Sequence, residues 1–147
     1  MATGEAQPPI EIIHHEGYDP SINSLFVPAI RAGGLLFVSG VTGAPVYHDH
    51  PHKAEDFDDL PTDAEGQARL AFAHLDLALG AGGSKREYVV SLTRFLTNIE
   101  QDQDIINRIQ GEYFRGHLPT STTVEVKRMA TDPRLRLEIQ AIAAVAG

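Results

Sequence analysis

The sequence predicts an α+β domain in which two helices pack on one face of a mixed β-sheet. Short runs rich in Val, Ile, Leu and Phe alternate with two longer segments in which apolar residues recur at helical spacing. Gly-containing turns separate these runs. A chain of 147 residues suits one domain. We expect a flexible N-terminal segment over residues 1–9 and a single domain over residues 10–147.

Three strands are expected before the first helix, over residues 10–15, 25–31 and 35–40. Ala32-Gly33-Gly34 reads as the turn between the second and third of them. Residues 41–60 lack a clear period and contain the runs HDHPH and EDFDD, so we expect an irregular loop there.

The second half of the chain predicts the order helix, strand, helix, strand, strand. Thr62 and Glu65 have the spacing of a capping box, and the first helix then ends at GAGG over residues 80–83. A strand follows over residues 88–97. The remaining elements are a helix capped by Asp102 or Asp104 that runs through Phe114, and two strands joined by a Pro-containing turn within Pro119–Ile139.

Composition excludes several classes of protein. The formal net charge of −8 and pI near 5.2 disfavour a general nucleic-acid binder, which needs a basic face for phosphate contacts. The absence of cysteine removes thiolate metal sites and a Cys nucleophile. Neither a secretory signal nor an apolar run of about 18 residues is present, so we expect no membrane partner and a soluble, cytoplasmic protein.

The closing segment carries the most specific pattern. Pro119, Thr120, Thr122, Val124, Lys127, Met129 and Leu137-Glu138-Ile139 resemble the closing signature of the Rid (YjgF/UK114) family of enamine and imine deaminases. RAGGLLFVSG, residues 31–40, resembles the hairpin of the same family, and the resemblance covers residues 25–142. It implies a chorismate-mutase-like (ferredoxin-like) fold, a homotrimer with clefts between its subunits, and hydrolysis without a cofactor or a metal.

Glu138 is the first candidate catalytic residue. Strand alternation places it on the face opposite Leu137 and Ile139. It has either a structural or a catalytic role. As a structural residue it is a solvated carboxylate or is paired with Arg136 or another neighbour; as a catalytic residue it holds the attacking water. The resemblance implies the second role, and a desolvated carboxyl group has the raised pKa that proton transfer needs.

The resemblance also implies substrate-binding residues, and some of them are changed. Ser121 occupies the position of an Arg that pairs with the substrate carboxylate, so small α-imino acids such as 2-iminopropionate should bind poorly. Phe26 replaces a cleft Tyr and removes a hydroxyl. Gly40 is retained, where a side chain would reach the ligand. Thr123 occupies the position whose backbone amide binds the ligand.

Arg94 interrupts the apolar strand YVVSLTRFLTN. A charge at such a position is normally paired or reaches the edge of the sheet. Arg94 is therefore either a structural partner of a neighbouring subunit's carboxylate or a substitute cation that contacts the substrate from a different wall.

His48, His50 and His52 stand at alternate positions around Asp49. Three interpretations remain open: a solvated loop, a zinc or nickel site, and a loop over the cleft in which one histidine, oriented by Asp49, acts as general acid or base. We place His48 and His50 among the candidate catalytic residues and expect no metal.

The sequence thus predicts a cofactor-free hydrolase that deaminates, or adds water to, an enamine, an imine or a related conjugated intermediate, as 2-aminomuconate deaminase does. Its expected partners are a small substrate and further copies of the chain. A non-catalytic trimer that binds a small ligand or a partner protein is the alternative, and metal-dependent hydrolysis through the three histidines is a third possibility.

Overall fold

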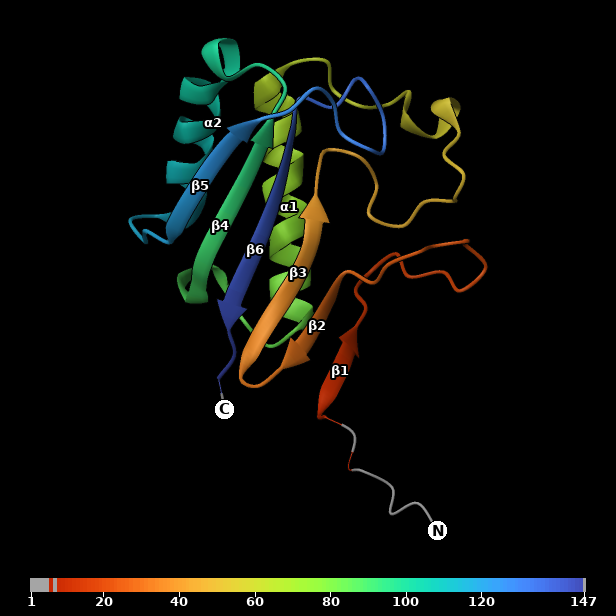
Figure 1. Ribbon diagram of the computed structural model, residues 1–147, viewed down its shortest axis with the longest axis vertical. Helices are drawn as coiled ribbons and strands as arrows, with labels where there is room; N and C mark the ends of the chain where they lie inside the picture. The colour runs from red at the N-terminus through yellow and green to blue at the C-terminus, as the bar shows by residue number, and fades with distance from the viewer. Residues whose placement is uncertain (1–5, 7, 147) are drawn as a thin grey trace.

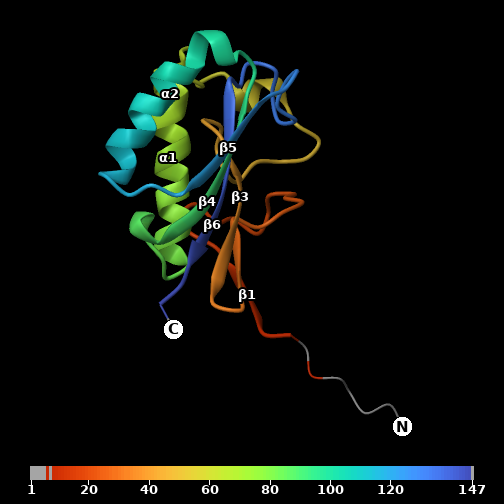
Figure 2. The same cartoon turned by 60° about the vertical axis from the view of Figure 1, so that its left-hand side comes forward.

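The structure is a computed structural model that describes residue 6 and residues 8–146. The predicted flexible segment 1–9 lies largely outside the described residues, and so does residue 147. Over the described part, six strands form one sheet and two helices cover one of its faces, as Figures 1 and 2 show. The α+β prediction is confirmed.

The sheet has the order β1-β2-β3-β6-β4-β5, and every neighbouring pair is antiparallel except β4 and β5, which are parallel. A mixed sheet was predicted and is found. The strands are β1 Ile10–Ile13, β2 Ala29–Ala32, β3 Leu35–Val41, β4 Val89–Leu96, β5 Thr120–Glu125 and β6 Leu137–Ala144. The helices are α1 Ala64–Ala81 and α2 Ile99–Phe114, with two short 3₁₀ turns at Ala54–Phe57 and Arg86–Tyr88.

The main core lies between the sheet and the two helices. Alternate residues of β6, such as Leu137 and Ile139, are buried beneath the helices together with Leu75 of α1 and Ile106 of α2. The residues between them, including Glu138, point to the face that the helices leave uncovered. Within the described residues no helix combines the length and apolar content needed to cross a membrane.

Several element boundaries differ from the prediction. β2 begins at Ala29, not at Leu25, because the preceding residues follow an irregular path. The first helix has Asp63 as its N-cap, without a side-chain capping bond, and Glu65 pairs with Arg108 instead of closing a capping box.

The second helix begins earlier than predicted. Asn98 caps it, and its side chain accepts a hydrogen bond from Gln101 N at 3.0 Å. Asp102, one of the predicted caps, is 1% exposed and accepts bonds of 3.0 and 2.8 Å from Arg136. The sequence predicted Asp102 as a helix cap because its partner, Arg136, lies far away in the chain and gives no local signal.

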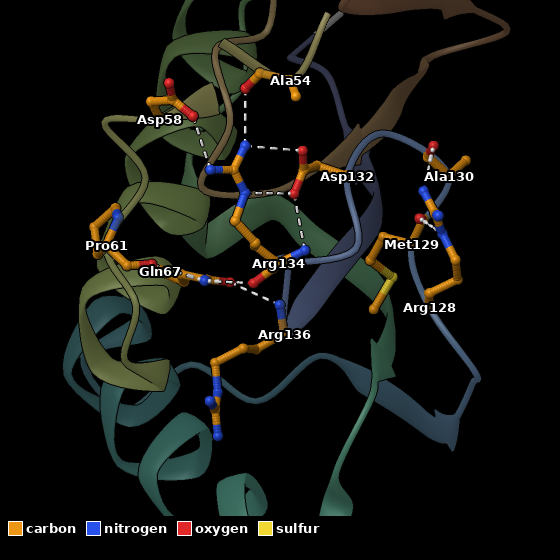
Figure 3. A network of polar contacts seen from close by, with 10 residues as sticks. All are labelled: Ala54, Asp58, Pro61, Gln67, Arg128, Met129, Ala130, Asp132, Arg134 and Arg136. Carbon is orange, nitrogen blue, oxygen red and sulfur yellow. Dashed lines mark hydrogen bonds and ion pairs between the residues drawn. The ribbon is translucent and has the colours of Figure 1, made fainter. Parts of the chain in front are cut away.

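The two closing strands are not a hairpin, because β4 lies between β5 and β6 in the sheet. Residues 126–136 form a loop across the end of the sheet instead. Arg134 holds this loop through Asp132, and it also donates to Asp58 and to Ala54 O in the loop after β3, as Figure 3 shows. The two loops are therefore cross-linked.

Gln67 of α1 joins the same loops from inside and is completely buried. Its Nε2 donates to Pro61 O at 2.8 Å and to Arg134 O at 3.0 Å, and its Oε1 accepts from Arg136 N at 2.7 Å (Figure 3). One side chain thus satisfies three backbone groups at the start of α1 and at the start of β6.

We expect Gln67→Met to lower the free energy of unfolding by about 1–3 kcal/mol, because it keeps the volume but leaves buried backbone groups unpaired. Urea unfolding followed by circular dichroism measures the change. Gln103→Met on α2 is the matched control and should change stability by less than about 0.5 kcal/mol. Equal stability of the two variants would contradict the assigned role of Gln67.

Candidate functional site

A pocket of about 230 Å³ lies where the end of β3 meets the start of β6. It brings together four of the predicted site residues, Phe26, Gly40, His48 and Glu138. These come from three separate segments: the irregular path before β2, the region from β3 to the following loop, and β6. The structure therefore joins residues that lie far apart in the sequence.

A β-bulge shapes the floor of this pocket. Val38 pairs with Ala141 and Val41 pairs with Ile139, so two residues of β3, Ser39 and Gly40, lie opposite one residue of β6. Such a bulge bends the strand and redirects its side chains, and bulges are frequent beside active sites. An uninterrupted strand was predicted over residues 35–40, because a bulge cannot be recognised from the spacing of apolar residues.

Gly40 makes room for Glu138. A Cβ atom at position 40 would lie 2.5 Å from Glu138 Oε2 and 2.8 Å from its Cδ, which is closer than non-bonded atoms approach. Gly40 was predicted from the resemblance to lie against the ligand. In this chain its missing side chain first admits the carboxylate of Glu138.

Glu138 is half-buried, and this burial raises the pKa of its carboxyl group. The sequence left open a pairing with Arg136. That pairing is wrong, because Arg136 binds Asp102 from the start of β6. Glu138 instead lies beside Phe95 of β4 on the uncovered face of the sheet. A carboxyl group in this setting can hold a proton closer to neutral pH than an exposed one.

His48 forms another wall of the pocket and is 8% exposed. Its Nδ1 lies 2.8 Å from Pro45 O. A carbonyl oxygen only accepts hydrogen bonds, so Nδ1 carries the proton and Nε2 of the neutral ring has a free lone pair. That Nε2 is buried without a hydrogen-bond partner among the described residues. Burial lowers the pKa of His48, so the ring is neutral near pH 7 and Nε2 is a hydrogen-bond acceptor.

His50 and Asp49 are held by Asn23 at the edge of the pocket. His50 Nδ1 donates to Asn23 O at 3.0 Å, and Asp49 Oδ1 accepts from Asn23 N at 2.9 Å. The interpretation that Asp49 orients a histidine is therefore wrong, since backbone carbonyls orient both His48 and His50. His50 is not among the residues that line the pocket, although its ring lies 6.0 Å from that of Phe26.

Ser121 and Thr123 lie elsewhere, on the edge strand β5. Their register partners on β4 are Leu92 and Arg94, which face the helices, whereas Glu138 faces the opposite side of the sheet. Val126 N donates to Leu96 O, and because N–H groups alternate along a strand, the N–H of Thr123 points to the open edge of β5. Within one chain these residues do not share a pocket with Glu138.

Arg94 is 4% exposed and lies beneath α2. Its guanidinium group donates to Thr123 Oγ1 at 2.9 Å, to Asn107 Oδ1 at 2.7 Å and to Gln110 Oε1 at 3.1 Å. Arg94 therefore lies on the other face of the sheet from Glu138 and cannot contact a ligand in the same chain's pocket. Its contacts are those of a buried structural cation, although no carboxylate takes part in them.

Sequence reasoning missed Thr131, which lines the pocket from the loop of residues 126–136. It also missed Val46 and Pro45 in the loop after β3. Neither segment has hydrophobic periodicity, so nothing in the sequence shows which of their residues face a cavity. The cross-links from Arg134 and Gln67, together with a buried apolar cluster of Ala44, Phe57, Met129 and Leu135, hold these loops together.

The sequence and the fold resemble those of known proteins. The model of the family described as endoribonuclease L-PSP matches residues 19–145. The RutC family protein YjgH of Escherichia coli is 35% identical over 103 residues, which cover 69% of this chain and 71% of that protein. A protein of unknown function, PA3499 of Pseudomonas aeruginosa, aligns with a TM-score of 0.77 and 27% identity over 95% of this chain and 94% of its own.

A third similar protein is also known from a solved structure. YyfA of Yersinia pestis, described as belonging to the conserved Rid protein family, aligns with a TM-score of 0.74 and 28% identity over 93% of this chain and all of its own. The mixed sheet with two helices on one face therefore defines a YjgF-type domain. The chain belongs to the Rid (YjgF/UK114) family, whose family model is the endoribonuclease L-PSP model.

Gly40→Ala should displace the Glu138 carboxylate and cost about 1–3 kcal/mol of stability, because a close-packed site cannot take an added methyl group without strain. Urea unfolding measures the loss. Gly111→Ala on α2 is the control, because a Cβ there meets nothing within 4 Å. That control should be unchanged or more stable by up to about 1 kcal/mol. A stable Gly40→Ala variant would contradict the packing described.

Glu138→Gln should make the protein more stable near pH 7. Because burial raises the pKa of Glu138 above its ordinary value of 4.5, its contribution to stability is complete below that value and is lost as the pH rises through the raised pKa. The amide has no such loss. Urea unfolding should show equal stability of the variant and wild type at about pH 3.5, and a more stable variant at about pH 7.

The control for that titration is Glu87→Gln, which changes an exposed carboxylate in the same way. It should differ from wild type by less than about 0.5 kcal/mol at both pH values. A Glu138→Gln variant less stable than wild type at pH 7 would show that the carboxylate is well paired and not desolvated.

Proposed function

We propose that the protein is a hydrolase that removes the amino group from an enamine or imine, or adds water to a related conjugated intermediate, of the kind that 2-aminomuconate deaminase uses. One observation carries this proposal: a desolvated carboxyl group, Glu138, lies in a pocket whose floor is opened by Gly40. A carboxyl group with a raised pKa exchanges protons with water and amines more readily near neutral pH.

The reaction follows from this carboxyl group. Glu138 accepts a proton from water as the water oxygen bonds to the imine carbon, which gives a tetrahedral carbinolamine. The protonated Glu138 then returns the proton to the amine nitrogen, and Glu138 next carries the hydroxyl proton from oxygen to nitrogen as the carbon–nitrogen bond breaks, so that the carbonyl forms and ammonia leaves. Each turnover consumes one water and releases one ammonia. No cofactor takes part in this sequence.

His48 fits a different role from the one first considered. Its Nδ1 donates a hydrogen bond to Pro45 O, and the unprotonated Nε2 can accept a hydrogen bond. A neutral ring in this state does not protonate a leaving group. We therefore assign the proton donation to Glu138, while His48 and Phe26 shape the pocket wall.

The substrate should bind without the cationic contact at position 121 that 2-iminopropionate needs. Ser121 supplies no positive charge where the family resemblance implies an Arg, and a bidentate guanidinium–carboxylate pair is stronger than any bond a hydroxyl makes. Phe26, 36% exposed at the pocket, adds an apolar wall. Both changes favour a larger ligand that does not rely on a cation at position 121.

We further propose a homotrimer with clefts between its subunits. Ser121 and Glu138 lie on opposite faces of one sheet, so a ligand that touches both requires two chains. The open N–H of Thr123 on the edge strand β5 would then receive developing negative charge from a ligand in a neighbouring subunit's pocket. The uncovered face carries exposed Phe37 and Val124, which supports its burial against another copy.

A non-catalytic trimer that binds a small ligand or a partner protein is the second candidate, and Ser121 and Phe26 favour it as marks of a lost activity. We do not propose a ribonuclease, because the net charge of −8 opposes contact with phosphates.

Ammonia release distinguishes the candidates. With 2-aminomuconate as substrate, Glu138→Gln should lower kcat by at least about 100-fold, which is the usual contribution of a general acid–base group. Glu87→Gln should leave kcat unchanged. With enzymatically generated 2-iminopropionate, wild type should be slow, and Ser121→Arg should raise kcat/KM by about 10-fold or more through the restored carboxylate contact.

Failure would take two forms. Rapid turnover of 2-iminopropionate by wild type would overturn the interpretation of Ser121. Equal ammonia release by wild type and a folded Glu138→Gln variant would remove Glu138 from the chemistry, and release no faster than in the absence of protein would support the non-catalytic candidate.

A further inference from the structure

His48, His50 and His52 converge beside the pocket, although the sequence analysis expected no metal there. One ring nitrogen from each lies within 4.8 Å of the other two, and the three ring centroids are 4.7 to 5.1 Å apart. Rings this close together can share one ion, because each neutral imidazole offers a nitrogen lone pair to a metal.

The hydrogen bonds of the loop prepare two of these rings for a metal. Nδ1 of His48 donates to Pro45 O, and Nδ1 of His50 donates to Asn23 O. Each bond fixes the tautomer whose Nε2 carries a lone pair, and metal-bound histidines commonly hold their second nitrogen in this way. His48 Nε2 is also buried and has no partner among the described residues, which is costly for a polar atom unless a ligand satisfies it.

The surroundings restrain the loop. Asn23 Nδ2 donates to His50 O at 2.6 Å and Asn23 O accepts from His50 N at 3.1 Å, so the loop is tied to the segment before β2. The rings of Phe26 and Phe57 flank the cluster, at 5.9 Å and 5.5 Å from His48. An apolar shell of this kind strengthens the interaction between an ion and its ligands.

We propose that His48, His50 and His52 bind one zinc-class divalent transition-metal ion through three imidazole nitrogens. Three nitrogens and an open fourth position are a known zinc arrangement. Nitrogens around tetrahedral zinc lie roughly 3.4 Å apart, so the widest pair must close by roughly 1.4 Å. His52 is exposed and free to turn toward the two anchored rings.

The site does not rest on the proposed deamination. His48 is the one member of the trio among the residues that line the pocket. An ion bound to Nε2 of His48 would occupy the nitrogen that otherwise accepts a hydrogen bond. A metal ion and a ligand in the pocket would therefore both contact His48.

Isothermal titration calorimetry with Zn²⁺ tests the site on the full chain without a polyhistidine tag. We expect one Zn²⁺ per chain for wild type. His52→Ala and His50→Ala should each weaken binding by about 10-fold or more. The matched control is His117→Ala, because His117 lies away from the cluster and its Nε2 bonds to Val89 O. That variant should bind Zn²⁺ as wild type does.

A second readout is independent of affinity. Co²⁺ in a site of low coordination absorbs visible light strongly, and the trio should give such bands in wild type and in His117→Ala but not in His52→Ala. His52 is exposed, so that variant should keep its fold, which circular dichroism verifies. If wild type binds no Zn²⁺, the proposal is overturned, whatever the ammonia assay shows. It is also overturned if folded His50→Ala and His52→Ala variants bind Zn²⁺ as tightly as wild type does.

Discussion

The buried amide of Gln67 is the constraint on which the site depends. It binds Pro61 O before α1, Arg134 O in the loop of residues 126–136, and Arg136 N at the start of β6. Glu138 lies two residues further along the same strand. Because strand side chains alternate with a period of two, a one-residue slip at the start of β6 would turn Glu138 toward the helices. The position of the carboxyl group is thus set by a helix residue that never touches the pocket.

The pocket contains features that cost stability. A bulge interrupts β3 at Gly40, a carboxyl group is desolvated without a counter-ion within the described residues, and His48 Nε2 is buried without a partner there. Each alone is a defect in a structural domain. Their presence in one cavity, with a well-paired network around Arg134 next to it, is the pattern expected of a functional site supported by a rigid frame.

The sequence was sufficient for the fold class because hydrophobic periodicity and glycine turns report on local structure. Only the family resemblance grouped Gly40, Phe26 and Glu138 as site residues, and in the structure all three line one pocket. The sequence was insufficient where a residue's partner is distant. Asp102 was predicted to cap a helix but pairs with Arg136. Arg94 was a candidate ligand contact but donates a hydrogen bond to Asn107 of α2. Loops such as the one carrying Thr131 have no period, so their contacts could not be read from the chain.

The division of the predicted site between two faces of the sheet determines how Ser121 can act. Glu138 and Phe95 face away from the helices, whereas Ser121 shares the register of Leu92 on the helix side of the edge strand. A charge introduced at Ser121 therefore cannot reach the same chain's Glu138 around β4. It can affect turnover only across an interface between copies, so rescue by Ser121→Arg would report on assembly as much as on recognition. The loss of that rescue on dilution to monomers would locate the cleft between subunits.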